Sequence, residues 1–165
     1  MLTKVMREFY EYGMWASHRL LDAAEGLTPE QFLESDLDGI WSIRDSLVHI
    51  MLWQWTWTER WNDRPPTRFP EDDRFSDVAT IRTFWTGVDG GIRALFDRLD
   101  DDQLARDLTC RDFSGNAWTF PFWGQLLQVA NHSTYHRGEI AALLTRHGAS
   151  PGELDFLVYR DEQRG

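Results

Sequence analysis

The chain has 165 residues, a formal net charge of −10, nine tryptophans and a single cysteine, so it suits one domain over residues 1–165 and excludes both a disulfide framework and a multi-thiolate zinc site. A surface this acidic repels phosphate backbones and anionic lipid, so we expect neither nucleic acid nor a membrane as a partner. The sequence shows no apolar run of bilayer length and no signal-peptide pattern in its first ten residues, which predicts a cytoplasmic protein.

The first predicted element is a helix over residues 2–24. Its apolar positions recur at intervals of three and four, which is the period of an amphipathic helix. Gly26 ends this helix. The following Thr28-Pro29-Glu30-Gln31 has the cap and the first-position proline of a short helical turn.

A second helix is predicted to begin at Ser42 and to end near Trp61. Ser42 and Asp45 have the spacing of a capping box, and the apolar stripe that follows is interrupted only by Gln54. Four tryptophans crowd this helix: Trp53, Trp55, Trp57 and Trp61. Core or interface packing is the plain interpretation of these rings, and an aromatic-walled pocket is the alternative.

A third helix is predicted from a cap at Ser76 to Leu99, although its internal glycines weaken it. A polar loop to about residue 74 precedes this helix, and residues 100–102 begin a short helical turn after it. Residues 106–113 and 117–120 flank a Ser-Gly-Asn turn, which predicts a small β-hairpin or an irregular insertion.

Pro121 opens the last long helix, which is predicted to end at Arg146 and to be followed by a short helical tail over 153–160. Four long amphipathic helices bury all their apolar stripes most simply by packing together. The sequence therefore predicts an all-α four-helix bundle with the small insertion before its last long helix.

Candidate metal ligands lie on two of these helices. His132 and His136 are four residues apart, so both imidazoles project from one helix face and can reach a single ion. Such pairs also occur on solvated faces. His49 occupies the matching flank of the second helix, and neighbouring helices would bring it opposite the pair. Three neutral imidazoles suit zinc or a similar divalent ion and leave positions open for water or substrate.

Other site types lack their residues. The sequence has no Glu-x-x-His pair of the di-iron bundles, no H-E-x-x-H, no G-x-S-x-G, no P-loop and no Rossmann glycine pattern. We interpret His18 and His147 as surface residues. Cys110 is interpreted as a packing residue, with a mildly activated thiol as the alternative.

On these residues the chain resembles the DinB/YfiT-like family of metal-dependent enzymes, which are four-helix bundles with a three-histidine site. The resemblance is carried by WASHRLL (15–21), WSIRDSLVH (41–49), NHSTYHRGEI (131–140) and LDFLVY (154–159). It implies that His49, His132 and His136 ligate one divalent transition metal, zinc or nickel, and that the protein is a homodimer. Glu139 stands where the family often has glutamine, so it either alters the metal site or pairs with Arg137.

The expected function is that of a divalent-metal-dependent enzyme acting on a small molecule. A metal-activated water would make it a hydrolase. Relatives that use low-molecular-weight thiols make a thiol S-transferase an equal candidate. Glu139 is the candidate base or imidazole partner, with a plain surface carboxylate as its alternative, and Trp53 and Gln128 are candidate pocket walls. The alternative function is non-catalytic: a stress-associated metal-binding protein or a dimeric interaction protein.

Overall fold

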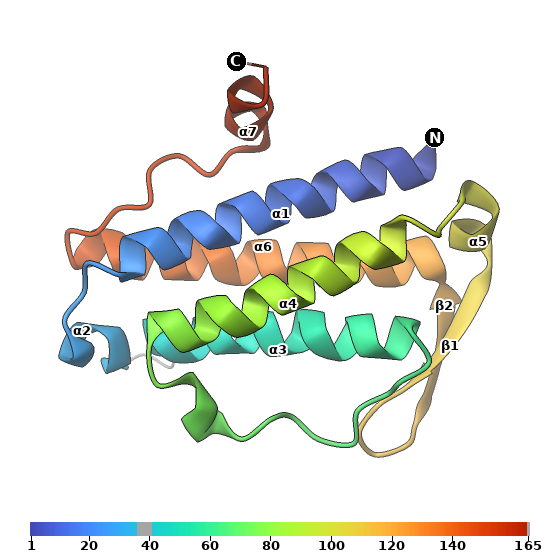
Figure 1. The fold of residues 1–165 in the computed structure, drawn as a ribbon, viewed down its shortest axis with the longest axis horizontal. Helices are drawn as coiled ribbons and strands as arrows, with labels where there is room; N and C mark the ends of the chain where they lie inside the picture. The colour runs from blue at the N-terminus through green and yellow to red at the C-terminus, as the bar shows by residue number, and fades with distance from the viewer. Residues whose placement is uncertain (36–40, 165) are drawn as a thin grey trace.

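Four long helices build the protein (Figure 1). The computed structural model describes residues 1–35 and 41–164. The long helices are α1 (Leu2–Ala24), α3 (Ile43–Trp61), α4 (Val78–Phe96) and α6 (Phe122–Arg146). Short elements join or follow them: α2 (Pro29–Leu33), the 3₁₀ turn η1 (Asp72–Phe75), α5 (Asp101–Ala105), β1 (Asp107–Arg111), β2 (Ala117–Pro121) and α7 (Phe156–Glu162). The predicted four-helix bundle with a hairpin before the last long helix is confirmed.

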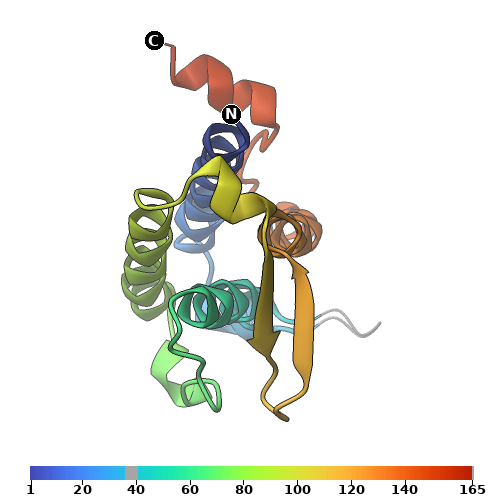
Figure 2. The same ribbon diagram turned by 90° about the vertical axis from the view of Figure 1, so that its right-hand side faces the viewer.

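The four long helices pack in a ring around one core, as the end view shows (Figure 2). Each contacts two neighbours: α1 packs on α4 and α6, and α3 packs on the same two helices from the opposite side. Leu20, Ile50, Ile92 and Leu126, one from each long helix, are almost completely buried. The predicted apolar stripes therefore face one another, which is the burial that stabilises a bundle.

Gln54 interrupts the apolar stripe of α3 for a reason that the structure supplies. Its Oε1 accepts a hydrogen bond of 2.8 Å from the indole nitrogen of Trp85 on α4, and its Nε2 donates to Ser133 Oγ on α6 at 3.2 Å. A buried indole N–H needs such a partner. One amide thus joins three helices at the level of the core.

Helix starts follow the predicted capping chemistry with one correction. Ser42 Oγ accepts from the backbone N–H of Asp45, as expected. The predicted cap at Ser76 is wrong by one residue. Asp77 caps α4 because its carboxylate accepts from Thr80 N–H while its own N–H donates to the Thr80 hydroxyl, and a carboxylate also suits the positive helix end. This helix ends at Phe96, three residues before the predicted Leu99.

The predicted hairpin forms as an antiparallel pair in which Thr109 lies opposite Thr119. Asp112 holds its turn by accepting from the N–H groups of Ser114 and Asn116, and Gly115 takes the positive φ that the turn requires. The strands pack beside α3 and α6. Within the described ranges, every helix is too short or too polar to cross a bilayer.

Candidate metal centre

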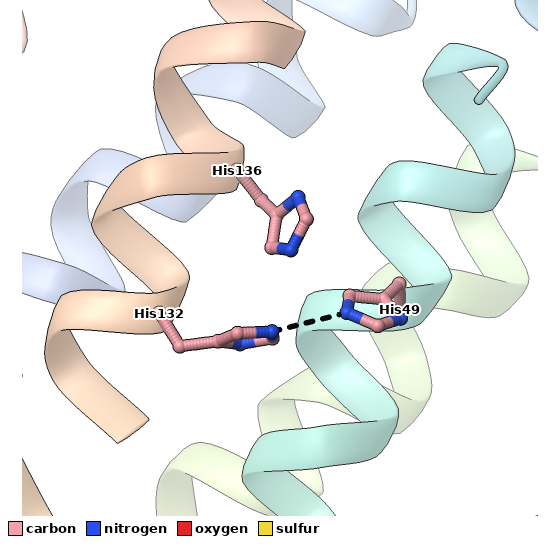
Figure 3. A group of neighbouring side chains, drawn as sticks. All are labelled: His49, His132 and His136. Atoms are coloured by element: carbon pink, nitrogen blue, oxygen red, sulfur yellow. Dashed lines mark hydrogen bonds between the residues drawn. The ribbon is translucent and has the colours of Figure 1, made fainter. Parts of the chain in front are cut away.

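Three histidines from two helices meet at one point (Figure 3). His49 comes from α3, and His132 and His136 come from successive turns of α6. One ring nitrogen of each lies within 4.8 Å of the other two, and the Nε2 atoms of His49 and His132 are 3.2 Å apart. The structure therefore brings together the three residues that the sequence proposed as ligands.

Polar contacts between α3 and α6 fix the register that places these rings opposite each other. The Gln54–Ser133 hydrogen bond lies next to His132 on α6 and little more than one turn beyond His49 on α3. Further along, the indole nitrogen of Trp61 donates to Gln125 Oε1 at 3.2 Å. Directional bonds of this kind resist sliding of one helix along the other, which apolar packing alone does weakly.

Glu139 lies against the metal-ligand candidate on its own helix. Its Oε2 is 2.7 Å from Nδ1 of His136, and it also hydrogen-bonds the Tyr135 hydroxyl, which raises the pKa of Tyr135. An imidazole that donates from Nδ1 carries its lone pair on Nε2. Pairing with Arg137, one expected alternative, is wrong: Arg137 is buried against α1, with its guanidinium over the Tyr12 ring.

Two of the rings are held in the neutral form. Burial, with smaller contributions from His136 and His132, lowers the pKa of His49 from 6.5 to about 4. Burial also lowers the pKa of His132. Neutral imidazoles are the form that binds metal, and nitrogens about 2.0–2.1 Å from a tetrahedral zinc lie roughly 3.3 Å apart. The His49–His132 separation of 3.2 Å is close to that value, so this pair of donors fits a divalent ion, and the third donor lies within 4.8 Å of both.

Aromatic rings border the histidines. The Trp41 ring centroid is 4.6 Å from that of His49, and the same indole stacks on His136 at 6.1 Å with an interplanar angle of 7°. The Trp53 ring centroid is 6.2 Å from that of His49. A depression of about 310 Å³ opens here and includes Trp41, His49 and Trp53 in its lining. Trp41 was not predicted as a wall residue, because it precedes the helix and has no periodic signal.

A larger cavity of about 640 Å³ lies one helical turn away. Both predicted wall residues line it: Trp53 is four residues after His49, and Gln128 is four residues before His132. Its other lining residues are Trp57, Arg60, Cys110, Arg111, Asp112, Phe113, Trp118, Phe120, Pro121, Trp123, Gly124 and Gln125. The tryptophans of α3 thus take both expected roles, because Trp61 is buried in the core while Trp53 and Trp57 wall the cavity.

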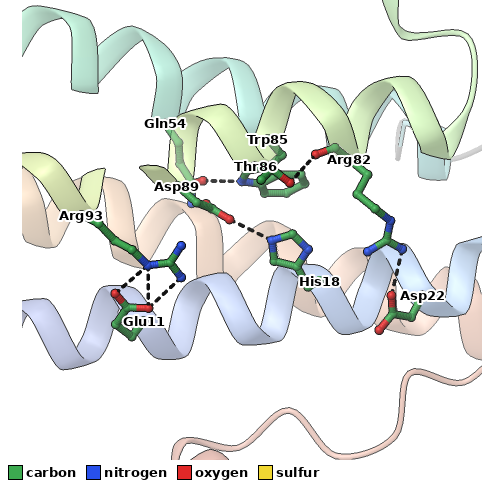
Figure 4. A network of polar contacts seen from close by, with 9 residues as sticks. All are labelled: Glu11, His18, Asp22, Gln54, Arg82, Trp85, Thr86, Asp89 and Arg93. Carbon is green, nitrogen blue, oxygen red and sulfur yellow. Dashed lines mark hydrogen bonds and ion pairs between the residues drawn. The ribbon is translucent and has the colours of Figure 1, made fainter. Parts of the chain in front are cut away.

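Three residues outside the metal cluster, His18, Cys110 and His147, test further sequence predictions. His18 is not a plain surface residue: its Nε2 lies 2.8 Å from the carboxylate of Asp89, which is 2% exposed, in the polar network between α1 and α4 (Figure 4). Cys110 is buried, and burial raises the pKa of its thiol, so the activated-thiol alternative is wrong. His147 is also largely covered and lies 3.6 Å from Glu34.

Comparison with known proteins gives consistent results over most of the chain. The model of the DinB family matches residues 1–165. Protein DinB of Bacillus subtilis (strain 168) is 22% identical over 160 residues, which cover 92% of this chain and 91% of that protein. The crystal structure of a DinB-like protein from Bacillus cereus ATCC 10987 superposes with a TM-score of 0.61 at 20% identity, and covers 85% of this chain and 91% of the other. At that identity the structural likeness supports the fold alone.

Proposed function

The chain belongs to the DinB family, and on that premise we propose that it is a divalent-metal-dependent enzyme in which His49, His132 and His136 hold the ion. The observation that carries the proposal is three imidazole nitrogens within 4.8 Å of one another, one helical turn from a cavity of small-molecule size. Imidazole nitrogen suits zinc and nickel. A bound ion would supply Lewis acidity, which lowers the pKa of a coordinated water or thiol toward neutral pH.

We propose Glu139 as a positioning residue for His136. Its hydrogen bond to Nδ1 holds the ring so that the opposite nitrogen, Nε2, is the one free to bind an ion. Glu139 is a positioning residue because it contacts His136, a proposed metal ligand, and not the substrate. Because Nδ1 and Nε2 lie on opposite edges of the imidazole, this hydrogen bond directs the carboxylate to the edge of His136 away from an ion bound at Nε2.

Of the two candidate reactions, we propose transfer of a low-molecular-weight thiol to an organic electrophile. With Glu139 engaged by His136 and Tyr135, the site favours a nucleophile that ionises readily by itself, as a thiol of ordinary pKa about 8.5 does. The thiol would come from solution, because the Cys110 thiol is buried with a raised pKa. In this reaction a sulfur–carbon bond forms, the leaving group departs with its electron pair, and the thiol proton passes to solvent.

Metal-loaded protein should accelerate conjugation of a simple thiol to an electrophile. The test pairs glutathione, cysteine and N-acetylcysteine with 1-chloro-2,4-dinitrobenzene and monobromobimane, and follows product by absorbance or fluorescence. His49→Ala should lower the rate by about 100-fold or more, because a metal ion contributes several kcal/mol to such a transition state. Equal rates for wild type and His49→Ala would contradict the proposal. Turnover of p-nitrophenyl acetate without any thiol turnover would favour the hydrolase instead.

We also propose that the protein is a homodimer that uses an apolar strip on the hairpin and α6. Trp118, Phe120, Trp123 and Leu127 are each between 41% and 54% exposed, and a monomer rarely leaves such a strip in water. Twofold pairing would cover it on both subunits. Light scattering should give twice the chain mass for wild type and the single mass for Leu127→Arg. A monomeric wild type at micromolar concentration would contradict the dimer.

A further inference from the structure

Arg60 is a buried cation in the wall of the large cavity. Its side chain is 7% exposed, and its Nε and Nη2 atoms have no hydrogen-bond partner among residues 1–35 and 41–164. The guanidinium lies 5.0 Å from the Trp57 ring and 5.4 Å from the Phe113 ring, and both rings line the same cavity. Buried N–H donors without an acceptor are uncommon, and each one left unpaired is costly.

The charged groups of the cavity leave a positive excess. Arg60 and Arg111 line it together with one carboxylate, Asp112. The Asp112 oxygens already accept hydrogen bonds from the backbone of Ser114, from the backbone and side chain of Asn116, and from the side chain of Trp118. Arginine keeps its charge at neutral pH even when burial lowers its pKa, as it does for Arg60. In a chain of net charge −10, this is a local environment for an anion.

We infer that this cavity binds a small organic anion with a flat apolar body. The body would lie among the rings of Trp53, Trp57 and Phe113, and a carboxylate or sulfonate would pair with the Arg60 guanidinium, whose fork of N–H donors suits such groups. The cavity volume of about 640 Å³ is adequate for a molecule of two or three rings.

The anion would be the substrate of the enzyme, and this assignment rests on the proposed function. Trp53 and Gln128 line the cavity one helical turn from His49 and His132, so the apolar end of the anion would extend toward the three histidines. Binding of the anion itself needs only the cavity and Arg60. It is therefore measurable on metal-free protein, separately from any reaction.

A matched pair of fluorescent probes tests the role of Arg60. 8-Anilinonaphthalene-1-sulfonate carries a sulfonate, and N-phenyl-1-naphthylamine has the same ring system without it. Wild type should bind the sulfonate probe more tightly than the neutral one. Arg60→Met should weaken the sulfonate probe by about 10–100-fold and leave the neutral probe unchanged, because hydrogen bonds to a charged group contribute about 1.5–3 kcal/mol. Arg60→Lys should recover part of the loss.

The matched control is Arg64→Met, which makes the same change in net charge at an exposed arginine paired with Glu59. It should leave both probe affinities as in wild type. Equal affinity of wild type for the two probes, or an equal loss of both in Arg60→Met, would overturn the inference. Thermal melting checks that each variant is folded. If Arg60→Met does not fold, Arg60→Gln is used in its place. Metal content should be unchanged in all of these variants, so a missing metal would count against the proposed function alone.

Discussion

Replacing His132 by alanine should remove the bound metal from the protein. Wild type dialysed against a slight excess of zinc or nickel should retain about one ion per chain. His132→Ala should bind that ion at least about 100-fold more weakly, because losing even an outer partner of a ligand typically costs 10–100-fold. The physical reason is that His132 supplies one of only three imidazole donors in the cluster: its Nε2 faces that of His49 at 3.2 Å, and its ring centroid is 4.6 Å from that of His136. Mass spectrometry of the dialysed protein measures the metal content.

Two control variants show whether the loss of metal in His132→Ala comes from losing a ligand or from any change of a histidine or a charge. His147→Ala removes a histidine at the end of α6 that lies outside the cluster, and it should keep the wild-type metal content. Glu139→Ala removes the partner of His136 Nδ1 but no ligand, so its affinity for the ion should fall by about 10–100-fold, less than for His132→Ala. Equal metal content in wild type and His132→Ala would end the assignment of this cluster as a metal site.

The sequence predicted the long helices well because their signals are local. The apolar period of residues 2–24 and the Ser42 cap identify α1 and the start of α3 without knowledge of the rest of the chain. The turn η1 was missed for the opposite reason. It is held by Arg44, whose Nε donates to the carbonyl of Phe75, 31 residues away, and Phe75 itself is 1% exposed. A short segment stabilised by so distant a partner has no local pattern to reveal it.

The candidate site likewise has features that the local sequence predicts and features that depend on tertiary packing. The spacing of His132 and His136 guarantees that they share a helix face, and the position of His49 on the flank of its stripe was enough to place it opposite. The stacking of Trp41 on His136 and the missing partners of Arg60 depend on how separate segments meet. The contact of His18 could not be predicted from its own helix, because the buried Asp89 that pairs with it belongs to α4.

Removing the metal with a chelator should abolish thiol transfer and leave the protein folded. The core does not depend on the histidines: Leu20, Ile50 and Leu126 are buried by contacts among the four long helices, and the Gln54–Trp85 hydrogen bond needs no ion. An ion present at 100 times its dissociation constant adds about 2.7 kcal/mol. For a chain of this size that corresponds to a fall in melting temperature of roughly 5–11 °C on stripping. Paired rate measurements and calorimetric melts, before and after chelation and after metal is restored, test this.

The melts with and without metal have to be compared at a pH above the range in which His49 titrates. Its pKa is lowered from 6.5 to about 4 in the folded protein, so between these values the unfolded chain binds the extra proton. Stability of the metal-free protein is therefore fully present above about pH 6.5 and declines as the pH falls toward about 4, whatever the metal does. His49→Gln should show a shallower decline. At about pH 7.5 this loss of stability is absent. A stripped protein that no longer melts cooperatively at that pH would assign the metal a structural role, in favour of the non-catalytic alternative.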